Sequence, residues 1–271
     1  MTSTTASMVV ASRDETRIAV FSRGNGPPLV LVHGATADHT AFRVVGPMLA
    51  ASFTVHAIDR RGRGASVDGE GPYSIEREFE DVAAVAETLA AGEAGAVDVF
   101  GHSYGGRCAL GAALLTDTIR RVISYEGAPT PSGWGYHPPG IEDRLRERLA
   151  AGDHHGALTA FLAEVVGMSG PDLAAYRADP IWPIRAAAAG TILRELEAEA
   201  DPVASLDRLA VVRQPVLQIL GGESLPVFRD STAALDERLA DGRIVVIDGA
   251  RHAAHHTHPD QVVAAVEAFL A

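Results

Sequence analysis

A serine stands at the centre of a Gly-x-Ser-x-Gly motif, with Ser103 flanked by Gly101 and Gly105. The apolar run Val97–Phe100 precedes it, and residues with helical spacing follow it. A sharp turn between a strand and a helix exposes the hydroxyl of such a serine, and residues two positions away must be small to fit. The start of the helix also directs N–H groups and the positive end of its dipole at charge developing on a ligand. We therefore predict that Ser103 is a nucleophile.

A second segment could stabilise the charge that such an attack creates. The apolar run Leu29–Val32 is followed by His33, Gly34 and Ala35. A backbone N–H just after a buried strand can join the first N–H of the helix after the serine in binding an oxyanion. Removal of one such donor typically lowers the rate by about two to three powers of ten. We predict that the main-chain N–H groups of Ala35 and Tyr104 form this oxyanion hole.

The elements around these residues follow the pattern of an α/β protein. Short apolar runs bounded by glycine and proline alternate with longer segments of helical spacing, which is typical of a parallel sheet with crossover helices. An N-terminal hairpin is expected at Met8–Ala11 and Arg17–Phe21. The expected buried strands are Pro28–Val32, Phe53–Ile58, Ala96–Phe100, Arg121–Tyr125, Val216–Leu220 and Arg243–Ile247. The expected helices include Ser74–Ala91, Tyr104–Leu115, Ile141–Ala151, Ile181–Ala200 and Gln261–Leu270.

The stretch 128–209 differs from the rest because it carries only helical patterns after a segment rich in proline, glycine and aromatic residues. We predict a core formed by residues 1–127 and 210–271, with residues 128–209 as a helical lid over the ligand-binding edge of the sheet. Aromatic side chains over a binding edge suit a hydrophobic ligand. The residues of the lid predicted to bind substrate are Trp134, Tyr136, His137, Phe161 and Trp182.

Composition narrows the class of protein. The chain has 271 residues, of which 47% are hydrophobic and 21% charged, and its formal net charge is −12. An acidic chain is poorly suited to neutralising phosphates, so nucleic-acid binding is not expected. No apolar run approaches the roughly 18 residues of a membrane span, and one cysteine cannot form a disulfide framework. We expect a cytoplasmic protein that does not bind membranes, and the sequence is compatible with a homodimer.

Several of these motifs together resemble the α/β-hydrolase superfamily. They are His33-Gly34, the segment Asp59–Gly64 after a strand, the segment Gly101–Gly106, and a histidine late in the chain, His252. The resemblance covers nearly the whole length and includes a similarity to zearalenone-type lactone hydrolases. It implies a mostly parallel sheet with flanking helices and a lid inserted late in the chain. It also implies hydrolysis of a small hydrophobic ester or lactone without a metal or another cofactor.

The general base implied by the resemblance is His252, in the loop after the last strand. In such enzymes the order along the chain is nucleophile, acid, histidine. His255, His256 and His258 follow closely, and they are expected to begin the terminal helix with partial exposure to solvent. They do not form a recognised metal-binding spacing with an acidic residue or cysteine, so no metal site is predicted.

The sequence does not single out the acid that orients the histidine as clearly as it does the serine. Most relatives carry an aspartate after the strand that corresponds to Val216–Leu220, but Gly221–Pro226 contains none. Some relatives take the acid from the end of the preceding strand, where this chain has Glu126. Glu126 is the favoured acid, and the alternatives are Glu223, Asp230 or a dyad without an acid. A carboxylate in this role fixes the tautomer of the imidazole.

A serine at position 103 excludes those reactions of the superfamily that need an aspartate nucleophile. Hydrolysis of an ester or lactone through an acyl-enzyme fits best. Hydrolysis of a C–C bond or a lyase reaction could use the same residues. A receptor that binds ligand without turnover is a further alternative on the same fold.

Overall fold

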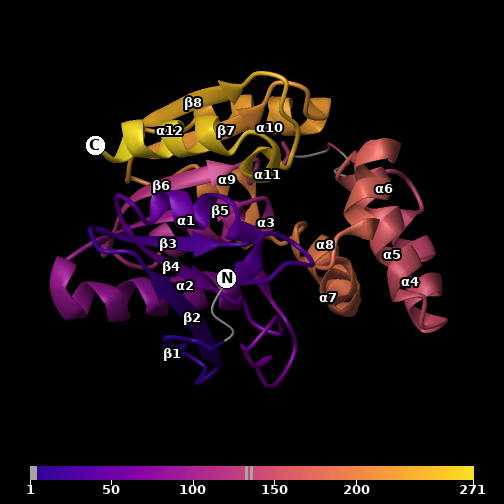
Figure 1. Ribbon diagram of the computed structural model, residues 1–271, viewed down its shortest axis with the longest axis horizontal. Coiled ribbons are helices and arrows are strands. Elements are labelled where there is room, and N and C mark those ends of the chain that lie inside the picture. The colour runs from indigo at the N-terminus through magenta and orange to yellow at the C-terminus, as the bar shows by residue number, and fades with distance from the viewer. Residues whose placement is uncertain (1–4, 132–133, 135–136) are drawn as a thin grey trace.

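The computed structural model describes residues 5–131, 134 and 137–271, with only the backbone at residues 93 and 94. Within these residues, one eight-stranded sheet has the order β1-β2-β4-β3-β5-β6-β7-β8 (Figure 1). The strands are β1 (Met8–Ala11), β2 (Arg17–Arg23), β3 (Pro28–Val32), β4 (Thr54–Ile58), β5 (Val97–His102), β6 (Ile119–Tyr125), β7 (Val216–Gly221) and β8 (Gly242–Ile247). β1 and β2 form an antiparallel hairpin, β2 pairs antiparallel with β4, and all other pairs are parallel. The predicted mostly parallel sheet is confirmed.

Helices cover both faces of the sheet. On β3, alternate side chains enter different cores: Val30 and Val32 join one cluster, and Leu29 and Leu31 the other. This alternation follows from the two-residue period of a strand. The first cluster packs against α2 (Ile75–Leu89), α3 (Tyr104–Ala113) and α10 (Pro226–Asp236), and the second against α1 (Val45–Leu49) and α12 (Pro259–Leu270). The central strands of the sheet are therefore apolar on both faces.

The expected helix start at Ser74 is observed. Ser74 is the N-cap of α2, and its side chain accepts a hydrogen bond from the N–H of Arg77. Such a bond satisfies one of the N–H groups that a helix leaves free at its start. The helix places Glu78 and Asp81 in the buried interior beside the segment that follows β4.

Between β6 and β7 the chain forms a helical insertion, which Figure 1 shows grouped at one end of the molecule. Its helices are α4 (Ile141–Ala150), α5 (His154–Ala160), α6 (Gly170–Ala178), α7 (Trp182–Ala187) and α8 (Ile192–Ala198), with a π-helical turn at Phe161–Val165 and a 3-10 turn at Ala188–Thr191. The pattern predicted as one helix over Ile181–Ala200 is therefore two helices separated by that 3-10 turn. The insertion has its own hydrophobic core, which extends to Leu196. The role of this insertion as a lid stays a prediction.

The chain returns to the main core before β7. The 3-10 turn Pro202–Ala204 and the short helix α9 (Leu206–Leu209) contact α3, and Leu206 and Leu209 belong to the core of the first sheet face. The packing of residues 202–209 is thus with the sheet domain rather than with the insertion. None of the helices in the described residues has the length and apolar character needed to cross a membrane.

Candidate active site

Ser103 occupies a sharp turn between β5 and α3. Its backbone has φ 55° and ψ −126°, a conformation that residues other than glycine rarely adopt. The N–H of Ser103 donates to the carbonyl of Tyr125 on the neighbouring strand at 2.7 Å. A Cβ atom at Gly101 would collide with the carbonyl of Gly105, and one at Gly105 would collide with the carbonyl of Val32. The spacing of the glycines is therefore a steric requirement of this turn.

His252 and Glu126 are joined by a hydrogen bond. His252 lies in the loop after β8, and Glu126 is the first residue after β6. The Nδ1 atom of His252 lies 2.5 Å from Oε2 of Glu126, and both residues are buried. Glu126 has a φ of 48°, so its backbone is held in an unfavourable conformation at the end of the strand. This geometry lets the carboxylate accept a hydrogen bond from the Nδ1–H group and leaves Nε2 of the imidazole to act as a base.

The second oxygen of Glu126 is held by the end of β7 and the segment that follows it, Gly221–Pro226, where the resemblance implies the usual position of the acid. Oε1 accepts the N–H of Gly221 at 2.7 Å and the hydroxyl of Ser224 at 2.5 Å. The side chain of Glu223 is 57% exposed and lies 3.6 Å from Arg251. The segment after β7 thus supplies donors to the carboxylate and not a carboxylate of its own.

Asp230, the other alternative acid, lies on α10 with its side chain 39% exposed, 3.6 Å from Arg229. The described contacts of neither Glu223 nor Asp230 include His252. Of the three carboxylates considered from the sequence, the structure brings Glu126 to the imidazole.

A buried layer of aromatic rings supports the loop that carries His252. Nε2 of His102 lies 2.8 Å from the carbonyl of His252, to which it can donate, and the ring of His255 packs at a tilt against that of His102, with 4.2 Å between the ring centroids. The hydroxyl of Tyr125 donates to the carbonyl of Arg251 and accepts the N–H of Ala254. These contacts fix the backbone on both sides of His252.

Burial lowers the pKa of both His102 and His255 well below the ordinary value, so these rings are neutral near pH 7. His255 is only 3% exposed, which corrects the expectation of partial exposure. The reason is that His255 lies in a separate short helix, α11 (Ala254–Thr257), which precedes α12 and packs His255 against His102.

A small pocket adjoins Ser103 and His252. Its volume is about 20 Å³, little more than the space of one water molecule. The predicted oxyanion residues Ala35 and Tyr104 and the predicted substrate-binding residue Phe161 all line it. The remaining lining residues are Val165, Val166, Ile192, Glu195, Leu196, Glu199 and Phe228.

The other aromatic residues predicted to bind substrate are placed differently. Trp134 is 53% exposed, and Trp182 is buried in the core of the insertion, where its indole N–H donates to His155. Neither is among the residues that line this pocket. His137 is half-buried and lies 3.1 Å from Glu199, while Tyr136 lies outside the described residues. Aromatic content alone could not separate residues that pack the insertion internally from residues that face the pocket.

Two carboxylates in the wall of the pocket were missed by the sequence reasoning. Glu195 and Glu199 are four residues apart, on α8 and just after it, so they share one face of a helix. That spacing, in a helix expected to cover the site, is the signal that could have found them.

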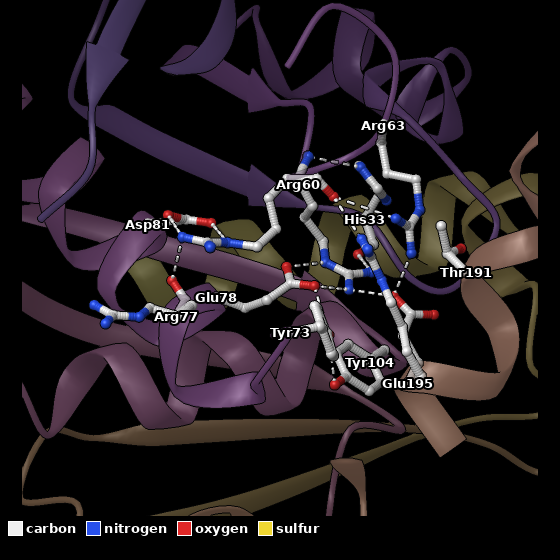
Figure 2. A network of polar contacts seen from close by, with 12 residues as sticks. His33, Arg60, Arg63, Tyr73, Arg77, Glu78, Asp81, Tyr104, Thr191 and Glu195 are labelled. Atoms are coloured by element: carbon white, nitrogen blue, oxygen red, sulfur yellow. Dashed lines mark hydrogen bonds and ion pairs between the residues drawn. The ribbon is translucent and has the colours of Figure 1, made fainter. Parts of the chain in front are cut away.

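Glu195 belongs to a buried network of charges, which Figure 2 shows between the core and the insertion. Arg60 donates to both oxygens of Glu78, at 2.8 and 2.6 Å, and also to Glu195. Arg63 donates to the same oxygen of Glu195 at 2.6 Å. Burial opposes the charge of Arg60, but Glu195 and Glu78 outweigh it and raise its pKa well above the ordinary value.

The network reaches the serine turn through Tyr104. The guanidinium of Arg60 lies over the Tyr104 ring at 4.6 Å, and the hydroxyls of Tyr104 and Tyr73 are 2.8 Å apart. Burial raises the pKa of both phenols, so they are neutral hydrogen-bonding groups here.

Within the described residues, no group of three or more histidine, cysteine or acidic side chains is arranged to hold a metal ion. The predicted independence from metals stays a prediction, because it concerns activity.

Comparison with known proteins agrees with the geometry. Residues 29–265 match the Alpha/beta hydrolase family, and the chain belongs to that family of hydrolytic enzymes. It is 30% identical, over 93% of its length and 90% of the relative, to 2-(acetamidomethylene)succinate hydrolase of Mesorhizobium japonicum. It is 29% identical, over 93% of its length and 99% of the relative, to a pimeloyl-[acyl-carrier protein] methyl ester esterase of Aeromonas hydrophila.

Among solved structures, an alpha/beta hydrolase from Sphaerobacter thermophilus is similar, with a TM-score of 0.82 and 32% identity over 97% of this chain and all of the other. The predicted fold and the predicted class of enzyme are thereby confirmed.

Proposed function

We propose that this protein hydrolyses a carboxylic ester or lactone with a hydrophobic portion through an acyl-enzyme intermediate. The observation that carries the proposal is the hydrogen bond between Glu126 and His252 beside a pocket that also contains Ser103. A buried carboxylate on Nδ1 selects the tautomer in which Nε2 can take a proton from a serine. Esterases among the relatives support the same type of reaction.

In the first half of the proposed reaction, His252 removes the proton of Ser103 while the serine oxygen bonds to the carbonyl carbon. The electron pair of the carbonyl moves to its oxygen, which the N–H groups of Ala35 and Tyr104 stabilise. The tetrahedral intermediate then collapses, and the alcohol leaves with the proton from His252. Glu126 stabilises the imidazolium that forms between these steps.

In the second half, water loses a proton to His252 and attacks the acyl carbon. A second tetrahedral intermediate expels the oxygen of Ser103, which regains its proton from His252. An acid product is released and the free enzyme is restored. Protein groups supply every proton transfer, so the proposal requires no metal or cofactor.

The apolar part of the pocket supports a hydrophobic substrate. Phe161 and Val165 of the insertion face this pocket together with Phe228 of α10. Because the pocket has room for little more than one water, a substrate must displace side chains as it enters. We propose that the helical insertion between β6 and β7, with helices α4 to α8, acts as the lid over this pocket.

Turnover of short-chain p-nitrophenyl esters, together with stoichiometric labelling by a serine-directed phosphonate, tests the proposal. We expect many turnovers per enzyme and one label per chain, both lost in Ser103→Ala. Labelling without turnover of esters or lactones would contradict ester hydrolysis and favour C–C bond cleavage. Binding of ligand without labelling or turnover would favour a receptor.

A further inference from the structure

The wall of the pocket contains a hydrogen-bond acceptor that the described residues leave unused. Glu195 is only 1% exposed, and both guanidinium groups that pair with it donate to the same oxygen, Oε1. Its other oxygen, Oε2, is buried without a hydrogen-bond partner among the described residues. Buried polar atoms are nearly always hydrogen-bonded in folded proteins. A donor is therefore missing at this atom.

The position of Glu195 indicates where that donor comes from. Glu195 lines the pocket that also contains Ser103 and His252. It is linked to the serine turn through Arg60, whose guanidinium covers the ring of Tyr104 at 4.6 Å. A molecule bound for attack by Ser103 thus lies beside the Glu195 side chain.

The charges around Glu195 define the type of donor. Arg60 and Arg63 face two carboxylates, those of Glu78 and Glu195, so the network is balanced without a further cation. Glu199, the second carboxylate of the wall, lies 3.1 Å from His137 and 3.6 Å from Arg107. A substrate carboxylate here would face two acidic groups, whereas a neutral O–H or N–H group would complete the hydrogen bonding.

We propose that Glu195 is a specificity-determining residue whose Oε2 accepts a hydrogen bond from an uncharged hydroxyl or amide N–H of the substrate. The preferred substrates are then neutral esters or lactones that carry such a donor on an otherwise apolar portion. This inference rests on the proposed ester hydrolysis and names the substrate class for the same site. A site built to hydrogen-bond a substrate group discriminates strongly against the analogue that lacks it.

The experiment compares matched esters on the wild-type enzyme. Each pair is a p-nitrophenyl ester of an unbranched acid of four to six carbons and its ω-hydroxy counterpart, and a third ester ends in a carboxylate. We expect one chain length at which the hydroxyl raises kcat/KM by about 10- to 100-fold, the range for a hydrogen bond to a charged group. The carboxylate ester should be the poorest of the three. Equal kcat/KM for the plain and hydroxylated esters at every length would overturn the inference, with water as the simplest partner of Oε2.

Two variants separate substrate recognition from a structural role. Glu195→Gln removes the charged acceptor in the pocket wall. Glu78→Gln removes the other carboxylate that pairs with Arg60, and Glu78 does not line the pocket. The hydroxyl preference should fall at least tenfold in Glu195→Gln and persist in Glu78→Gln. Equal losses of preference in both variants would contradict the inference. If Glu195→Gln does not fold, the wild-type comparison still decides.

Labelling with phosphonates distinguishes this inference from the proposed function. Alkyl phosphonates with and without the ω-hydroxyl react with Ser103 and need no turnover. Faster labelling by the hydroxylated probe supports the role of Glu195, even if no ester is hydrolysed and the proposed function fails. Ester turnover without a hydroxyl preference in either assay supports the proposed function and overturns the role of Glu195.

Discussion

Replacement of Glu126 by glutamine tests the link between the carboxylate and the imidazole. Glu126 accepts from three groups: His252 through Oε2, and Gly221 and Ser224 through Oε1. In Glu126→Gln the amide oxygen can keep the two donors of the β7 segment. The amide nitrogen then faces Nδ1 of His252 and donates to it, so the imidazole carries its proton on Nε2 instead.

The wrong tautomer removes the base that Ser103 needs. In a serine protease, replacement of the orienting carboxylate by its amide lowers kcat by about four powers of ten with the geometry intact. Each tenfold change in rate corresponds to about 1.4 kcal/mol, so the barrier should rise by about 5.5 kcal/mol. The side chain keeps its size and the bonds to Gly221 and Ser224, and we therefore expect a melting temperature within a few degrees of the wild type.

The assay is kcat for a p-nitrophenyl ester at pH 7 to 8, with thermal unfolding measured on the same samples. Glu223→Gln is the matched control, because its side chain is 57% exposed and lies outside this hydrogen-bond group. It should retain kcat within about twofold. Activity of Glu126→Gln within tenfold of the wild type would refute the assignment, and a severe loss in Glu223→Gln or Asp230→Asn would transfer the role to that residue.

Further predictions concern the nucleophile, the base, metals and pH. Ser103→Ala and His252→Ala should each lower kcat by at least about four powers of ten, and the double variant should be no worse, because such groups act as a unit; full activity in either single variant contradicts its role. Dialysis against a strong chelator should leave ester hydrolysis unchanged, and a loss restored by zinc or manganese would show that a metal is needed. Burial and the nearby Arg43 lower the pKa of His256 to about 4, against an ordinary 6.5. The unfolded chain therefore binds this proton first, and stability present above pH 6.5 is lost as the pH falls toward 4. Urea unfolding at pH 7, 5.5 and 4.5 should show a smaller loss for His256→Asn than for the wild type, and equal losses would contradict the assignment.

Local sequence determined the elements and the serine turn. The apolar run of β3 and the capping serine of α2 are consequences of neighbouring residues, so they can be predicted without the rest of the chain. The limit on Gly101 is local as well, because a Cβ there would collide with the carbonyl of Gly105, whereas the limit on Gly105 comes from Val32 of β3. The family motifs are short segments of this kind, and this is why fold and enzyme class could be predicted.

Other features depend on which distant segments the sheet brings together. Parallel pairing of β6 with β7 sets Tyr125 beside Ile219, and only this register puts Glu126 within reach of Gly221, Ser224 and His252. From the sequence, Glu126 and Glu223 were competing acids, since both follow buried strands. Long-range packing turns the side chain of Glu126 toward His252 and leaves that of Glu223 exposed to solvent.

The composition of the pocket was likewise decided by tertiary structure. From the sequence, Trp134 and Trp182 are as plausible as Phe161 for binding substrate. In the structure Phe161 lines the pocket, whereas Trp134 is exposed and Trp182 packs inside the insertion. Glu195 would be read from the sequence as a solvent-exposed helix residue, because buried carboxylates are rare unless paired. Its partners Arg60 and Arg63 lie about 130 residues earlier in the chain. Helical periodicity fixes the face on which Glu195 lies, but only the docking of α8 against the segment after β4 makes that face the wall of the site.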